Sequence, residues 1–251
     1  MGLVTVITSG KGGVGKSTLA VGLGCTLAKN EKRVLLIDGD AGLRSLDIML
    51  GIDHELVFDI ADIVNGNCEP IKAIYNCKES LGLNTLFLLP APALEKDTVH
   101  PAVMKQLIPS LARYYDHIII DCPAGVGKGF ASAVAAANRA LVVSTPEQVA
   151  IRDCTKVRQL LETQGITEQR LVINRFHYPV FCKMQHFQDM DKIIDQTGIR
   201  LIAVMPNDFQ LQVQPAKAVT EHPRCPGSLA LQRLAARLEG QSVPLFPLEK
   251  L

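Results

Sequence analysis

The feature that constrains this chain most is the glycine-rich run Gly10-Lys11-Gly12-Gly13-Val14-Gly15-Lys16-Ser17-Thr18. It fits the pattern G-x-x-x-x-G-K-[ST] without a gap. An apolar run, Leu3 to Ile7, precedes it, and a second, Leu19 to Leu23, follows it. Glycines let backbone N–H groups turn inward toward a phosphate, and the positive end of the following helix points at the same place. The run therefore predicts a phosphate-binding loop between a strand and a helix.

Two side chains of this loop are expected to carry chemistry. Lys16 would reach the β and γ phosphates of a bound nucleotide, and the Ser17 hydroxyl would be a ligand of Mg²⁺. The alternative is a glycine-rich turn that binds nothing, and the complete motif between a strand and a helix argues against it. Lys11 is a second lysine, which the general pattern does not require.

Composition narrows the class of protein. With 251 residues, 47% of them hydrophobic, the chain can bury a large core. A single domain over residues 1–251 is predicted, with an irregular tail at 241–251. The formal net charge of +1 gives no global field for nucleic acid, so no direct nucleic-acid binding is expected. Seven scattered cysteines form no C-x-x-C pair, and with no signal peptide they indicate the cytoplasm.

Short apolar runs alternate with helical patterns along the chain. Continuously apolar strands separated by helices are typical of a parallel sheet that is buried on both faces. The prediction is an α/β P-loop NTPase fold, with a twisted, mostly parallel sheet of about seven or eight strands and helices on both faces. Seven strands are predicted, at Leu3 to Ile7, Arg33 to Asp38, Leu83 to Leu89, His117 to Asp121, Ala140 to Val143, Leu171 to Asn174 and Leu201 to Met205.

Asp121 ends an Ile-Ile-Ile strand and has the form of a Walker B carboxylate. Cys122-Pro123-Ala124-Gly125 follows it as a glycine-containing turn. A carboxylate at the carboxyl end of a parallel strand lies in the crevice where such sheets bind ligands. Asp121 is therefore expected to orient Mg²⁺, through a water molecule. The alternative is a buried strand whose Asp caps the next helix.

Asp38 and Asp40 follow the second predicted strand and are separated by one glycine. Two carboxylates so close together could not both be buried without a cation. The predicted compensation is Mg²⁺ together with an attacking water molecule. The alternative is that one of them caps the following turn.

The extra lysine makes a resemblance specific. Lys-Gly-Gly-Val-Gly-Lys-Ser, residues 11–17, resembles the deviant Walker A motif of the MinD/ParA family of ATPases. The resemblance implies that Lys11 reaches across an ATP-bound homodimer to the partner's phosphates. The segment from Asp38 to Asp47 resembles the switch I of that family, which implies that Asp40 positions the hydrolytic water and Asp38 supports the γ-phosphate and metal.

Further positions match the family in its own order. Asn174 and Arg175 match its adenine-recognising segment, and an Asn amide can both donate to and accept from the base. Pro206-Asn207-Asp208 matches the loop on the other side of the adenine, and Glu147 matches a residue that contacts the partner's nucleotide. Asn207 and Gly127 stand where the family usually has acidic residues.

The resemblance covers most of the chain and is closer to the MinD branch than to the ParA branch. It implies a Mg²⁺-dependent ATPase that acts in placing the cell-division site, through partners of the MinC or MinE type. The alternatives are a ParA-like DNA-associated cargo positioner and a metallocentre-maturation ATPase of the same fold. Residues 241–251 contain two prolines and a single lysine, so they do not predict the basic amphipathic helix that binds this family to membranes. Peripheral location at the inner face of the membrane would then require a partner or a further segment.

One stretch stays outside this assignment. Phe176 to Asp191 carries His177, Cys182 and His186, whose spacing matches no zinc pattern. A surface that covers the core is predicted there, and no metal.

Overall fold

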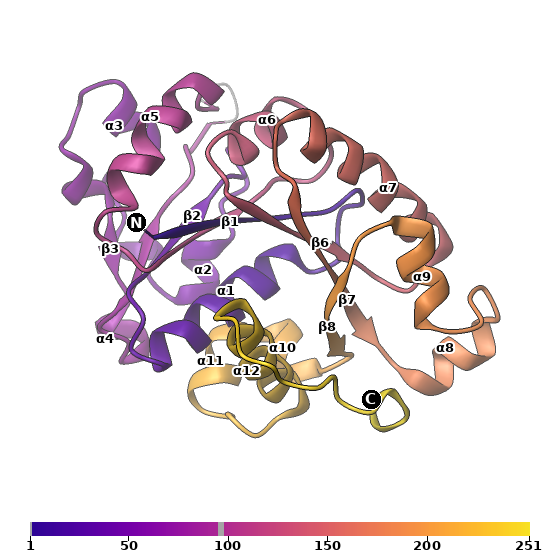
Figure 1. Cartoon of the computed structure of the whole chain (residues 1–251). Helices are drawn as coiled ribbons and strands as arrows, with labels where there is room; N and C mark the ends of the chain where they lie inside the picture. The colour runs from indigo at the N-terminus through magenta and orange to yellow at the C-terminus, as the bar shows by residue number, and fades with distance from the viewer. Residues whose placement is uncertain (1, 95–97) are drawn as a thin grey trace.

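The computed structural model describes residues 2–94 and 98–251. Over these residues the strands form one eight-stranded sheet in the order β3-β4-β2-β5-β1-β6-β7-β8. Figure 1 shows the sheet running through the middle of the molecule, with helices on both sides. The strands are β1 Leu3–Thr8, β2 Val34–Asp38, β3 Tyr75–Asn76, β4 Leu86–Leu89, β5 His117–Asp121, β6 Arg139–Ser144, β7 Glu168–Phe176 and β8 Leu201–Pro206.

The strand pairs are parallel except for the β3–β4 pair, which is antiparallel at the edge of the sheet. The central strand β5 shows why its sequence is apolar throughout. Ile118 and Ile120 face one core, and Ile119 faces the other. Both faces are covered, so no position of the strand can be polar without cost. The predicted fold class is confirmed.

Helices form a layer on each face of the sheet. One core is closed mainly by α3, α5, α6, α7, α8 and α9, and the other by α1, α2, α10, α11 and α12. The helices on the first face are α3 Ile60–Val64, α5 Pro101–Leu111, α6 Lys128–Val134, α7 Gln148–Thr163, α8 Tyr178–Met184 and α9 Met190–Thr197. The others are α1 Lys16–Lys29, α2 Leu46–Leu50, α4 Lys78–Leu81, α10 Phe209–Val213, α11 Pro215–Thr220 and α12 Pro226–Leu238.

Helix α1 is buried on nearly all sides, because it packs between the sheet and the α11–α12 pair. Two of its glycines permit this close approach. A Cβ on Gly22 would lie 2.6 Å from Leu231 Cδ1 of α12, and one on Gly24 would lie 2.8 Å from Leu36 Cδ2 of β2. This packing fixes the start of α1, and with it the glycine-rich loop.

The structure differs from expectation near the β3 edge. The sequence from Pro70 to Tyr75 favours an amphipathic piece, but the structure has a short 3-10 turn, Pro70–Ala73, followed by β3. Tyr75 explains the change, because its hydroxyl accepts hydrogen bonds from the N–H groups of Val57 and Phe58 and donates to the Phe58 carbonyl. These contacts hold β3 against the preceding loop, which a helical pattern does not reveal.

Residues 241–251 run back over the molecule with little regular structure. Arg237 Nε donates to the Val243 carbonyl, and the Arg233 guanidinium lies 4.8 Å from the Phe246 ring centre. The Leu251 carbonyl accepts a hydrogen bond from Tyr178 N at 2.9 Å. Among the described residues, none of the helices has the length and apolarity needed to span a bilayer.

Candidate functional site

The glycine-rich loop connects β1 to α1, as its sequence predicts. Gly13 and Gly15 have φ values of +76° and +95°, which L side chains rarely adopt. Gly15 also precedes the first residue of α1, and a Cβ there would collide with the Asn174 amide. Lys16 begins α1 with only 8% of its surface exposed. The loop is therefore a backbone cradle of the kind that binds phosphate groups at a helix N-terminus.

Asp121 ends β5 beside this cradle, in register with Ile7 of β1 and Asp38 of β2. It is 2% exposed, and its Oδ1 has no hydrogen-bond partner in the structure. The Ser17 hydroxyl forms a hydrogen bond with this carboxylate. Burial raises the pKa of Asp121 to about 7, and the charge of Asp38 adds to this rise, although Ser17 and the charge of Lys16 oppose it.

These groups fit a magnesium ion. An orphaned carboxylate oxygen and a serine hydroxyl are hard oxygen donors, which Mg²⁺ prefers. A buried carboxylate with an unpartnered oxygen is also costly unless a cation or a hydrogen bond compensates it. Ser17 and Asp121 are the residues that would hold the ion, and their role as its ligands stays a prediction.

Asp38 has a different environment from the one expected. Its Oδ1 accepts a hydrogen bond from Asp40 N, and its Oδ2 accepts two, from Ser45 N at 2.9 Å and Leu46 N at 3.1 Å. Leu46 is the first residue of α2, so Asp38 caps that helix. Asp40 is only half-buried. Backbone N–H groups compensate Asp38, which fits the alternative prediction of a cap on the following turn, and Asp40 is not fully buried. A Mg²⁺ ion at this pair stays a prediction.

Asn174 lies against the cradle from the end of β7. Its Nδ2 donates to the Val14 carbonyl at 2.7 Å, across 160 positions of sequence. A bulge between Ile173 and Phe176 aims it there, and exposed Arg175 absorbs the bend with a φ of +54°. The structure thus brings Asn174 to the phosphate loop itself, and leaves the Arg175 side chain on the surface.

The loop after β8 has a strong structural role. Asp208 Oδ1 accepts a hydrogen bond from Leu211 N, and its Oδ2 accepts one from Gly227 N. It therefore joins the starts of α10 and α12. Asn207 is exposed and accepts a hydrogen bond from Gln212 Nε2 through its side-chain oxygen. Pro206 ends β8 and is buried.

Lys11 and Glu147 meet each other. Lys11 Nζ lies 2.8 Å from Glu147 Oε2, and the two side chains are 45% and 47% exposed. The resemblance assigned both residues to contacts with a partner subunit. On a single chain they form an exposed ion pair at the rim of the cradle.

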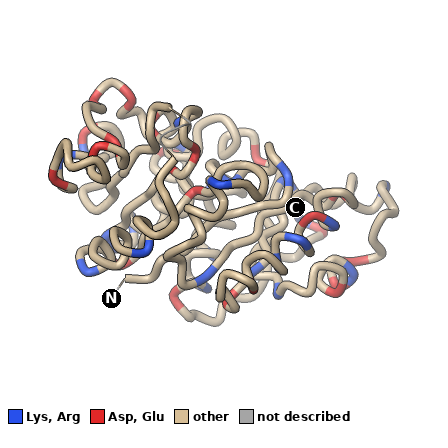
Figure 2. The backbone as a smooth tube through the Cα atoms, turned by 90° about the horizontal axis from the view of Figure 1, so that it is seen from above, with Lys and Arg blue, Asp and Glu red and all other residues tan. Residues whose placement is uncertain are grey.

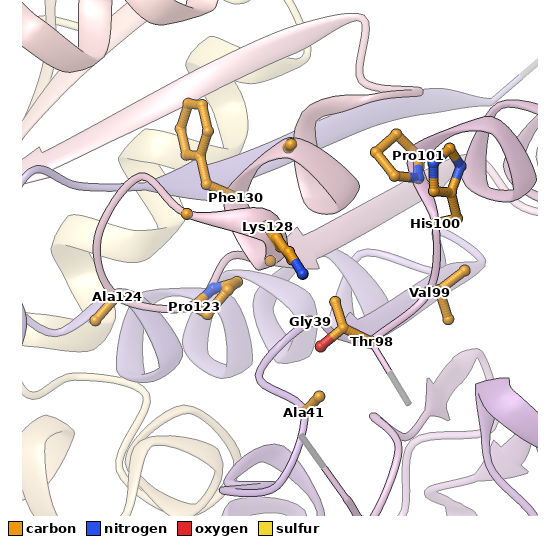
Figure 3. Close-up of a pocket in the computed structure, with 13 residues that line it drawn as sticks. Gly39, Ala41, Thr98, Val99, His100, Pro101, Pro123, Ala124, Lys128 and Phe130 are labelled. Carbon is orange, nitrogen blue, oxygen red and sulfur yellow. The ribbon is translucent and has the colours of Figure 1, made fainter. Parts of the chain in front are cut away.

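A cavity of about 960 Å³ adjoins this site, and sequence reasoning missed part of its wall. The expected turns at Gly39 and Pro123 form one side, and the start of α5, with Thr98 and His100, forms another. Figure 3 shows Lys128 extending into the space between these walls. No motif marks the Thr98–His100 segment, because its position arises only from the packing of α5 against α6.

Comparison with known proteins agrees with this geometry. Residues 2–238 match the ParA family model, described as NUBPL iron-transfer P-loop NTPase. The septum site-determining protein MinD of Thermotoga maritima is 41% identical over 250 residues, which are 98% of this chain and 91% of that protein.

Two solved structures extend the likeness. MinD in the MinC:MinD cell division protein complex of Aquifex aeolicus has a TM-score of 0.86 and 35% identity, covering 98% of this chain and 99% of that one. MinD of Pyrococcus horikoshii complexed with Mg-ADP has a TM-score of 0.83 and 27% identity, covering 95% and 96%. With its deviant glycine-rich loop, its carboxylates at the strand ends and this match along its length, the chain belongs to the MinD/ParA family of P-loop ATPases.

Proposed function

We propose that this chain is a Mg²⁺-dependent ATPase that forms a homodimer with ATP and acts, through partner proteins, in placing the cell-division site. The observation that carries the proposal is the pairing of a backbone phosphate cradle with the orphaned Asp121 oxygen beside Ser17. The relatives support its biological part, since several are septum site-determining proteins.

In this proposal each residue of the site has its own role, and the contacts described above support the assignment. The backbone N–H groups from Gly10 to Lys16 and the Lys16 ammonium hold the β and γ phosphates. Ser17 and Asp121 hold Mg²⁺, which supplies charge neutralisation on the phosphates when bound. Asp40 orients the attacking water from the half-buried turn. Asp38 contributes indirectly to the metal and γ-phosphate region, by fixing switch I through the N–H groups of Ser45 and Leu46.

The adenine lies, in this proposal, between Asn174 with Arg175 and the loop Pro206-Asn207-Asp208. The Asn174 Nδ2 already donates to the Val14 carbonyl, so the base uses the amide's remaining hydrogen-bonding capacity. Both Asp208 oxygens accept from backbone N–H groups, so Asp208 shapes the pocket and leaves the direct contact to its neighbours.

The homodimer is supported by exposed apolar side chains around the nucleotide crevice. Four of them lie in or directly after the loops at the carboxyl ends of strands, and each is more than half exposed: Leu43, Val126, Val149 and Phe209. Apolar groups gathered at one end of a sheet favour a partner surface. A second copy, facing this one across the two cradles, would cover them and receive Lys11 and Glu147 at its nucleotide.

The proposed partner is of the MinC type, because a solved relative is a MinC:MinD complex. The proposed location is the cytoplasm, with recruitment to the inner face of the membrane through a partner or a further segment. For the metallocentre alternative, the described residues include no group of three or more His, Cys, Asp or Glu able to hold a metal.

The test begins with ATP binding. Lys16→Ala should weaken ATP affinity by about 100-fold or more, because it removes the cation that faces the β and γ phosphates. Isothermal titration calorimetry with Mg²⁺ measures this, with Lys78→Ala on exposed α4 as the control. Wild-type affinity in Lys16→Ala would disprove the phosphate assignment.

The proposed role in cell division is tested by ATP-dependent binding of purified MinC to Asp40→Ala, a variant expected to hydrolyse ATP slowly. Absence of that binding would count against the proposed role.

A further inference from the structure

A second polar cavity lies at the amino ends of the strands, whereas the proposed nucleotide crevice lies at their carboxyl ends. It has a volume of about 320 Å³ and is lined by residues at the amino ends of β7 and β8 and by the second half of α7. Three of its lining residues are arginines: Arg158, Arg170 and Arg200. Figure 2 shows Lys and Arg interspersed with Asp and Glu along the backbone.

The fold forces these positive charges together. Arg170 lies in β7 and Arg200 directly precedes β8, and the two are neighbours because Leu171 N donates to the Arg200 carbonyl at 2.8 Å. Like charges at neighbouring positions of a sheet are destabilising. Arg158 joins them from α7, which packs against the same part of the sheet. Without a compensating anion, repulsion among the three guanidinium groups lowers the free energy of unfolding.

The carboxylates nearby compensate the cluster only in part. Glu162 pairs with Arg158 Nη1 at 2.8 Å, whereas Glu168 lies 3.9 Å from Arg170 Nη2. Arg200 makes no ion pair with any residue that the structure describes. Three guanidinium groups therefore share two carboxylates, and the one at Arg200 is left over.

Two buried atoms of the lining also lack hydrogen-bond partners. Arg158 Nε has no acceptor, and Gln169 Oε1 has no donor, although Gln169 Nε2 donates to the carbonyls of Ile166 and Arg158. Both atoms are shielded from solvent, so they lie beneath the lining as unsatisfied polar groups and do not themselves face the cavity.

We propose that this cavity binds the phosphate group of a small phosphomonoester. The planar guanidinium fork matches phosphate oxygens, and three arginines supply the charge that a dianion needs. The volume lies within the range of small-ligand sites. The site is independent of the nucleotide crevice, and its test does not rest on the function proposed above.

The experiment is a calorimetric titration of inorganic phosphate into protein already saturated with Mg²⁺-ADP. Wild type and Arg113→Gln, which changes an exposed arginine outside the cavity, should both bind phosphate at this additional site. Arg200→Gln and Arg170→Gln should weaken it by about tenfold or more. Phosphate that binds the nucleotide crevice would be unaffected by either substitution, so the difference between variants isolates the cavity.

Thermal unfolding of Arg200→Gln and wild type, with and without phosphate, distinguishes loss of the phosphate site from loss of folding. Arg200→Gln removes a repelling charge, so without phosphate its thermal midpoint should equal or exceed that of wild type, and phosphate should raise it less. Equal phosphate affinity in wild type, Arg170→Gln and Arg200→Gln would overturn the proposal, and so would the absence of an additional site tighter than about 1 mM.

The source of the phosphate group is resolved by two further probes. Glycerol 3-phosphate offers the monoester in solution, and vesicles containing phosphatidic acid offer it on a lipid headgroup. Binding that falls in Arg200→Gln with the first probe indicates a soluble metabolite, and with the second it indicates a lipid. If neither probe distinguishes Arg200→Gln from Arg113→Gln, the cavity does not bind a phosphomonoester and the proposal is wrong.

Discussion

Asp38 and Asp121 are neighbouring buried carboxylates that differ in how many hydrogen bonds they accept, and this difference separates a structural residue from a candidate metal ligand. Asp38 and Asp121 are in register on adjacent strands, and each is 2% exposed. Asp38 accepts three backbone hydrogen bonds, which is enough to hold a carboxylate in place. Asp121 retains an oxygen without a partner beside the Ser17 hydroxyl. Asp121 is the less compensated of the two carboxylates, so a bound cation would stabilise the protein more at Asp121 than at Asp38.

Asp121→Asn should make the nucleotide-free protein more stable while abolishing Mg²⁺-dependent ATP binding. The substitution keeps the side-chain shape and removes a poorly compensated buried charge, a gain of about 1–3 kcal/mol at pH 8. The folded pKa of Asp121, about 7, lies above its ordinary value of 3.8. Its stabilising contribution is therefore complete below pH about 4 and is lost as the pH rises through 7.

The advantage of the Asn variant should accordingly grow between pH 5 and pH 8, as measured by urea unfolding without nucleotide. Ser17→Ala serves as the comparison, since it removes the neighbouring hydroxyl and leaves the charge. An Asn variant less stable than wild type at pH 8 would show that the carboxylate is compensated after all.

At the scale of the element, strands buried on both faces were the easiest to predict. His117–Asp121 has the predicted bounds, since its apolar run ends abruptly at a carboxylate. The helix α1 also follows the glycine-rich loop directly, as the motif predicts. In contrast, β3 was missed because two residues carry no periodic pattern, and the Tyr75 contacts that hold it come from distant backbone.

The candidate site divides in the same way. Residues in one contiguous motif, such as the glycine-rich loop, were predictable because their spacing carries the chemistry. The Asn174 contact with Val14 and the His100 wall were not, since they depend on a bulge and on helix packing. The Lys11–Glu147 pair was also unexpected, because both residues had been assigned to an interface between chains.

Gly22→Ala tests how tightly α1 is packed. Alanine is favoured over glycine inside a helix by about 1 kcal/mol, so a loosely packed helix would be stabilised. Here the added Cβ meets Leu231, which is fully buried, and we expect a net loss of about 1–3 kcal/mol. Chemical denaturation measures the change. Leu231→Val in the same chain should recover part of the loss, and a stabilised Gly22→Ala would show that α12 yields easily.

At the scale of the whole molecule, a partly buried ionic network lies at the amino ends of the central strands. His117 Nε2 lies 2.8 Å from Glu239 Oε1, and Lys32 reaches the other oxygen of Glu239 at 2.7 Å. Arg139 lies beside them, bonded to Thr5 and to the Leu238 carbonyl. The network joins the end of α12 to the sheet, at the opposite end from the proposed nucleotide site.

This network predicts a pH dependence of stability. Burial lowers the pKa of His117, and the charges of Arg139 and Lys32 add to this, although Glu239 opposes them. A lowered folded pKa means that the contribution of His117 is complete above its unfolded value of about 6.5 and is lost as the pH falls through the folded pKa. The stability of wild type relative to His117→Gln should thus decrease from pH 7.5 to 5.5, by at most about 1.4 kcal/mol per unit. Asp121 has the opposite sign but is common to both proteins, so their difference isolates His117. Parallel urea-unfolding curves across this range would contradict the prediction.

The proposed nucleotide-dependent homodimer gives the last prediction. Lys11→Ala should bind ATP normally yet fail both to dimerise and to hydrolyse it. Two nucleotides that face each other across a two-fold interface bring strong negative charge together, and each needs a cation from the opposite chain for closure. A cation delivered only on closure also stabilises the transferring phosphoryl group, an effect worth about 10³–10⁵ in rate when an arginine finger supplies it.

The ion pair of Lys11 with Glu147 must break for this to happen, and its geometry makes that inexpensive. Both side chains are nearly half exposed, and such pairs contribute about 0–1 kcal/mol. Lys11→Ala and Glu147→Gln should therefore both leave monomer stability within about 1 kcal/mol of wild type, which excludes misfolding as the cause of any lost activity.

Hydrolysis per subunit in wild type should rise with protein concentration. Mixing in an equal amount of Lys11→Ala should reduce the hydrolysis rate by more than dilution does, whereas mixing in Lys78→Ala should not. Analytical ultracentrifugation with ATP provides the direct measurement. A Lys11→Ala protein that sediments as an ATP-dependent dimer and turns over normally would mean that each subunit completes its own site, and that the exposed lysine serves only its contact with Glu147.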